Sequence, residues 1–151
     1  MLCMLASACT QSESGYRYVA TEEAREADGV FLFDAELGDT TLAYTLNLAA
    51  RVVTSRIPDR LLRLDILVTD PLGAPTIDHV TIPLREGPGI RLKLGSGSVI
   101  DIETAWQKDL HVPASRTGRW QIAVTAADTA QLYALYGIGF SYSGTPWEKG
   151  N

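Results

Sequence analysis

Apolar and polar residues alternate with a period of two in six segments of the chain, which is the spacing of side chains along one face of a β-strand. The segments are 31–37, 42–50, 62–69, 79–84, 120–126 and 138–142. The apolar faces comprise Phe31, Phe33, Ala35, Leu37, Leu42, Tyr44, Leu46, Leu48, Ala50, Leu62, Leu64, Ile66, Val68, Val80, Ile82, Leu84, Trp120, Ile122, Val124, Ala126, Ile138, Phe140 and Tyr142. Strands that are apolar on one face are typical of antiparallel sheets covering a shared core.

The connecting segments agree with this assignment. Asp70, Pro71 and Gly73 stand at the positions that a type I turn favours, which predicts a hairpin there. Short helical turns are expected at 21–29, with Thr21 as the N-cap, and after Asp128, where a capping box begins. We therefore predict an all-β fold: one antiparallel, two-layer β-sandwich domain over 16–144, followed by a frayed tail over 145–151.

The first nine residues resemble the end of a bacterial lipoprotein signal. Leu5-Ala6-Ser7-Ala8 precedes Cys9, and small side chains there let an extended segment enter a peptidase cleft. Cys9 is the predicted site of lipid attachment, with 1–8 as the remnant of a truncated signal and 9–15 as a flexible polar tether. No Lys or Arg precedes Arg17, so the positive start of a signal would lie upstream. The alternative is a cytoplasmic protein that begins with apolar residues.

Net charge, cysteine positions and the lengths of apolar runs exclude several kinds of partner and site. The formal net charge is -5, which repels phosphate backbones, so nucleic acid is not an expected partner. The two cysteines, Cys3 and Cys9, both lie at the start, so the predicted domain has no cysteine for a disulfide or a metal site. The longest apolar run is shorter than the roughly 20 residues of a spanning helix.

Candidates for catalysis or metal binding are few. His79 and His111 are far apart in the chain, and each is interpreted as a solvated side chain. Gly95-Ser96-Gly97-Ser98 is interpreted as a turn, because a phosphate cradle needs a helix after it and strand-like residues follow instead. Asp101 and Glu103 share one strand face, where a solvated surface is favoured over calcium binding. No catalytic residue, cofactor or metal is expected, although scattered acids leave a glycoside hydrolase as an open alternative.

Tryptophans suggest an alternative in which the domain binds glycans. Trp120 belongs to an apolar strand face and is expected in the core, whereas Trp106 and Trp147 fall outside the alternation. Exposed tryptophans on a β-sandwich stack on sugar rings or anchor a protein partner. The simpler interpretation is that both cover an end of the core.

Several short motifs together resemble the gliding-motility lipoprotein GldH family over roughly 16–143. They are Tyr16-Arg17-Tyr18 after the lipidation motif, Leu46-Asn47-Leu48, Asp70-Pro71-Leu72-Gly73, Asp78 to Leu84, the spaced Gly89, Leu92, Gly95 and Gly97, Trp120-Gln121-Ile122, and Leu132 to Phe140. The chain departs from the family at Arg91, where a tryptophan is usual.

This resemblance implies a non-catalytic accessory of gliding motility and the associated protein secretion, acting through contacts with other envelope proteins. The family has no catalytic residues to carry over. The neutral Thr10 after Cys9 fits release to the outer membrane, and the periplasmic face is the expected location.

Overall fold

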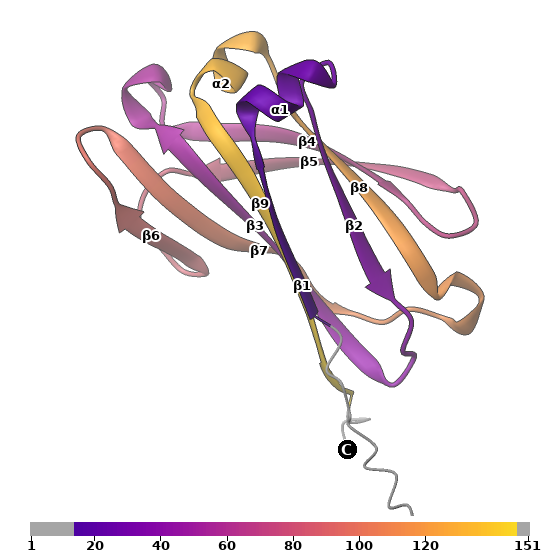
Figure 1. Ribbon diagram of the computed structural model, residues 1–151. Helices are drawn as coiled ribbons and strands as arrows, with labels where there is room; N and C mark the ends of the chain where they lie inside the picture. Colours follow the sequence, from indigo (N-terminus) through magenta and orange to yellow (C-terminus); the bar gives the residue numbers. More distant parts are fainter. Residues whose placement is uncertain (1–13, 148–151) are drawn as a thin grey trace, which may run out of the picture.

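Two antiparallel sheets pack face to face in the computed structural model, which describes residues 14–147 (Figure 1). The five-stranded sheet has the spatial order β1 (Ser14–Ala20), β9 (Leu135–Pro146), β3 (Leu42–Val53), β7 (Val99–Leu110), β6 (Ile90–Leu94). The four-stranded sheet has the order β2 (Val30–Leu37), β8 (Gly118–Ala126), β4 (Leu61–Thr69), β5 (Pro75–Pro83). The strands pair antiparallel throughout residues 14–147, so the predicted all-β, two-layer sandwich is confirmed.

The alternating apolar faces point into the space between the sheets. Phe31, Tyr44, Leu64 and Phe140 are almost completely buried there, in agreement with the period-two pattern. Burying such a side chain contributes about 1.5–3 kcal/mol, which is why these faces fix the strand register. Other predicted core residues are only partly buried at the margin of the cluster: Val68, Val80, Trp120, Ala126 and Tyr142.

Strand boundaries differ from the sequence prediction at several points. β1, β6 and β7 lie outside the six alternating segments. Of these three strands only the start of β7 was expected, from the strand-like residues after Ser98, and β7 continues to Leu110. β1 begins at Ser14, inside the predicted tether, and β9 extends through Pro146, inside the predicted frayed tail. The N–H of Trp147 also donates to the carbonyl of Thr41 at 2.8 Å. These segments are ordered by ladder bonds to neighbouring strands, which local sequence does not reveal.

Turns and helices follow the sequence signals in part. Gly73 has φ of 81° and its N–H donates to the Asp70 carbonyl at 2.9 Å, closing the β4–β5 hairpin as predicted. The helices α1 (Thr21–Glu26) and α2 (Thr129–Tyr133) lie at the same end of the sandwich (Figure 1). Asp128 caps α2 by accepting from Gln131 N at 2.8 Å, as predicted.

The N-cap expected at Thr21 is wrong. Ala20 precedes the first helical residue of α1 and makes no side-chain capping bond. Thr21 is instead buried, and its hydroxyl donates to the carbonyl of Leu135 at 2.7 Å. The threonine therefore ties α1 to β9, because a buried hydroxyl needs a partner and the nearest one belongs to another strand. Two 3-10 turns complete the described chain, η1 (Thr54–Arg56) and η2 (Ala114–Arg116).

Candidate functional site

A hollow of about 550 Å³ lies on the outer face of the five-stranded sheet. Four strands of the sheet supply its walls, and β9 runs beneath it. The side chains that give it chemical character are Tyr16 and Tyr18 from β1, Arg51 from β3, Asp101 and Glu103 from β7, and Arg91 from β6.

Two glycines of β9 make room for the hollow. In the sheet register Gly137 pairs with Arg51, and Gly139 pairs with Ala49 on one side and with Tyr18 on the other. A Cβ on Gly137 would collide with the Tyr18 hydroxyl, and a Cβ on Gly139 would lie 3.4 Å from the Tyr16 hydroxyl. The missing side chain at Gly137 therefore makes room for Tyr18 over β9, and Tyr16 lies in van der Waals range of Gly139.

The tyrosines remain accessible on their outer side. The exposed fraction is 71% for Tyr16 and 43% for Tyr18. Burial raises the pKa of Tyr18, an effect that the nearby Arg51 charge partly opposes. The Tyr18 hydroxyl therefore keeps its proton at neutral pH and can act as a hydrogen-bond donor.

Ion pairs form the opposite wall. Arg51 donates from Nε to Oδ1 of Asp101 at 2.8 Å and from Nη2 to Oδ2 at 3.1 Å. These bonds lower the pKa of Asp101 and raise that of Arg51. Arg91 lies farther from Glu103, with 4.0 Å between nitrogen and oxygen. The wall therefore presents carboxylate acceptors and guanidinium donors side by side.

Asp101 and Glu103 do share one face of a strand, as the sequence predicts, but each carboxylate faces an arginine across the sheet. Within residues 14–147, no three His, Cys, Asp or Glu side chains cluster closely enough to hold a metal ion. The pattern Tyr16-x-Tyr18, with the two rings on one strand face, is the sequence signal that could have located the hollow.

An apolar row crosses the outer face of the other sheet. We define it as Leu32, Ala123, Leu67 and Ile77, which are consecutive register partners on β2, β8, β4 and β5. The exposed fraction is 52% for Leu32, 39% for Leu67 and 65% for Ile77. The row is thus a continuous line of apolar side chains on the solvent face.

The two histidines lie apart from the hollow. His79 is exposed on β5 and its Nδ1 contacts the Asp65 carboxylate across the β4–β5 pair. His111 follows β7, and its ring lies 4.4 Å from that of Trp147.

The tryptophans also have separate positions. Trp106 is partly buried and its Nε1 donates to Oδ2 of Asp78 at 2.7 Å, whereas Trp147 stays exposed beyond the end of β9. Trp120 packs at the margin of the core and donates to the Arg116 carbonyl at 3.0 Å. Neither Trp106 nor Trp147 lines the hollow.

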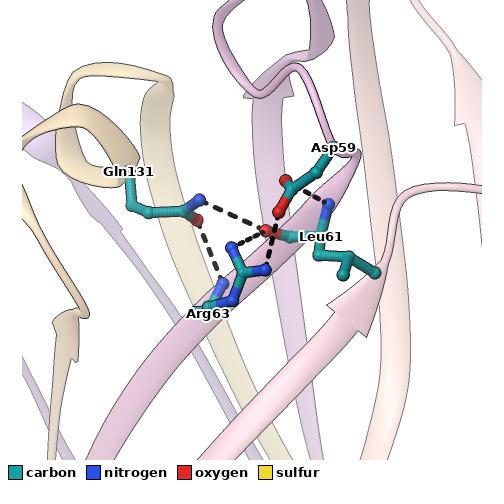
Figure 2. A network of polar contacts seen from close by, with 4 residues as sticks. All are labelled: Asp59, Leu61, Arg63 and Gln131. Atoms are coloured by element: carbon teal, nitrogen blue, oxygen red, sulfur yellow. Dashed lines mark hydrogen bonds and ion pairs between the residues drawn. The ribbon is translucent and has the colours of Figure 1, made fainter.

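A buried amide joins α2 to β4, as Figure 2 shows. Oε1 of Gln131 accepts from Arg63 N at 3.0 Å, and Nε2 donates to the Leu61 carbonyl at 3.2 Å. Arg63 also donates to Asp59 at 2.6 Å. The Gln131 amide thus takes the place of a strand partner where β8 has ended, which is a structural role.

The predicted lipid-attachment residue, Cys9, lies outside the described residues, as do 1–13 and 148–151 as a whole. None of the described helices is both long enough and apolar enough to cross a bilayer. Comparisons with protein-family models, with curated proteins and with solved structures gave no match.

Proposed function

We propose that this chain is a non-catalytic β-sandwich module that is anchored in the outer membrane by acyl chains on Cys9 and docks onto other proteins of the cell envelope. The apolar row of Leu32, Ala123, Leu67 and Ile77 carries the docking part of the proposal. Contiguous apolar side chains on a solvated face, rimmed by polar residues, are characteristic of protein interaction sites.

The residues that flank the row are mostly polar. The neighbouring register line on one side is polar except at its β2 end, and that on the other side is polar except at its β5 end. The first line consists of Val30, Thr125, Asp65 and His79, and the second of Asp34, Gln121, Thr69 and Pro75. An apolar centre with a polar rim is the usual anatomy of a protein interface. We expect the partner to present a complementary apolar surface to this sheet.

The biological role follows from the resemblance to the GldH family. We propose an accessory role in gliding motility and the associated protein secretion, with the domain on the periplasmic side of the outer membrane. Deletion of the gene in a gliding host should impair surface spreading and secretion. Normal spreading and secretion in the deletion strain would contradict this role.

Docking is tested by site-specific cross-linking in native cells. A photo-reactive residue at Ile77 is expected to form an adduct with an envelope protein, and Leu67→Asp in the same chain should abolish it. Leu94 is the matched control position, because it is an exposed apolar residue on β6 of the other sheet. Equal adducts at both positions, or none at Ile77, would contradict docking through the row.

Anchoring is tested by growing cells with labelled palmitate. The wild-type product should carry label, Cys9→Ser should lose it, and Cys3→Ser should keep it, since Cys3 precedes the predicted cleavage point. Acyl chains hold a protein at a membrane by about 0.8 kcal/mol per buried methylene, so Cys9→Ser should also release the domain from membranes. An unlabelled wild-type product would contradict the anchor.

A further inference from the structure

The hollow on the five-stranded sheet combines two chemical surfaces that face each other across β9. Tyr16 and Tyr18 supply accessible aromatic rings from β1. Arg51 and Asp101 supply charged, planar hydrogen-bonding groups from β3 and β7. This hollow and the apolar row lie on the outer faces of different sheets, so a ligand in the hollow would not occupy the surface of the docking partner.

Sugar rings match both surfaces. A pyranose ring has an apolar face of C–H groups that packs on an aromatic ring, while its hydroxyls both donate and accept hydrogen bonds. Asp101 and Glu103 offer acceptors, and Arg51 and Arg91 offer donors, all within the lining of one hollow. A ligand that was purely anionic would use only the arginines, and a purely apolar one would leave all four charges without new partners.

Asp101 is better suited to bind a sugar than to act as a general acid in cleavage of a glycosidic bond. A general acid in glycoside hydrolysis needs a raised pKa, so that it holds its proton near neutral pH. The two hydrogen bonds from Arg51 lower the pKa of Asp101 and keep this carboxylate ionised. Asp101 is therefore suited to accept hydrogen bonds from hydroxyl groups.

We propose that this hollow binds a saccharide, with a sugar ring stacked on Tyr16 and Tyr18 and its hydroxyls bound by Arg51, Asp101 and Glu103. Gly137 sets the depth of the site beneath Tyr18, because a side chain at this position would displace the Tyr18 ring. The tyrosines, and not Trp106 or Trp147, are the aromatic residues that contact the sugar.

The proposal is tested with the purified full chain and three probes: chitohexaose, cellohexaose and a hexamer of galacturonic acid. Titration calorimetry should detect binding of at least one probe. Tyr16→Ala should weaken that binding by about tenfold, which corresponds to the loss of one stacked ring. Tyr136→Ala is the matched control, because Tyr136 is exposed on β9 but does not line the hollow. This variant should bind the probe as tightly as the wild type does.

A second variant tests the geometry with both tyrosines in place. Gly137→Ala places a Cβ that overlaps the Tyr18 hydroxyl and lies 2.8 Å from the carbonyl oxygen of Val19, so the Tyr18 ring must shift and binding should weaken. Circular dichroism melting curves establish that the variants fold.

Three outcomes would overturn the proposal: no probe binds at millimolar concentration, Tyr16→Ala binds like the wild type, or the galacturonic acid hexamer alone binds and depends on Arg51 but not on Tyr16. The cross-linking result at Ile77 tests docking and does not depend on any of these three outcomes.

Discussion

The indole N–H of Trp106 donates a 2.7 Å hydrogen bond to Oδ2 of Asp78, and this bond joins the two sheets of the sandwich. Trp106 belongs to β7 of the five-stranded sheet, and Asp78 belongs to β5 at the edge of the other. A hydrogen bond to a charged acceptor contributes more than one between neutral groups. Trp106 is therefore a structural residue at the boundary of the core.

Replacing Trp106 by Phe should lower the free energy of unfolding by about 1.5 kcal/mol, because the donor to Asp78 is lost while an aromatic ring remains. Urea denaturation measures the change. Trp120→Phe serves as the control, because its indole donates to the Arg116 carbonyl at an exposed position and a water molecule can replace it. Equal losses in the two variants would contradict a special role for the Trp106 bond.

Removing the Gln131 amide should also destabilise the fold. Gln131→Ala leaves the backbone N–H of Arg63 and the carbonyl of Leu61 without this partner, at a cost of about 2 kcal/mol (Figure 2). The amide hydrogen of Arg63 should then exchange faster with solvent, which NMR detects directly. Gln121→Ala on the exposed face of β8 should leave both quantities unchanged.

The Arg51–Asp101 ion pair should make the free energy of unfolding depend on pH. The pKa of Asp101 is lowered from its ordinary value of 3.8, chiefly by hydrogen bonds from Arg51. A lowered pKa in the folded state means that the pair stabilises the fold above the unfolded pKa and loses this effect as pH falls through the folded pKa.

An NMR titration of the Asp101 carboxyl group should therefore give a midpoint below 3.8, and Arg51→Met should raise it. Arg91→Met is the matched control, because Arg91 lies 4.0 Å from Glu103 and makes no bond to Asp101 that would hold its pKa down. An unchanged midpoint in Arg51→Met would show that another group lowers the pKa.

Two leucines of β4 that point to opposite faces should respond differently to truncation. Leu64→Ala in the core should cost about 3 kcal/mol, from lost burial and the cavity left behind. Leu67→Ala in the apolar row should cost less than about 0.5 kcal/mol, because Leu67 is exposed on the outer face. Thermal and urea unfolding measure both, and similar losses would contradict the assigned register of β4.

Much of the fold was predictable because strand faces and turns are encoded by residues that are close together in the sequence. The period-two alternation over 31–37 and 62–69 reports directly which side chains are buried, and the structure confirms those faces. Asp70 and Gly73 encode their turn through backbone preferences that need no distant contact. The apolar row was less visible, because Leu32 and Leu67 look like neutral members of a polar strand face until the register aligns them with Ile77.

The alternation of apolar and polar residues did not reveal β1 and β6, because both depend on contacts that are not local in the sequence. Arg91 and Lys93 alternate with apolar residues over only five positions in β6, and the inward residues of β1 include Arg17. Both are edge strands, which carry charged residues and bury few side chains. Their order comes from ladder bonds to β9 and β7, which depend on the whole sheet.

The sequence by itself determined the fold class, the inward faces of the central strands and the turn chemistry, because burial and backbone preferences act between residues close in the chain. Only the tertiary structure decided that Tyr16, Arg51 and Asp101 line one hollow and that Leu32 and Ile77 belong to one row. These neighbours come from strands far apart in the sequence. Their proximity depends on strand order and register, which are set when all the buried faces of the sandwich pack together.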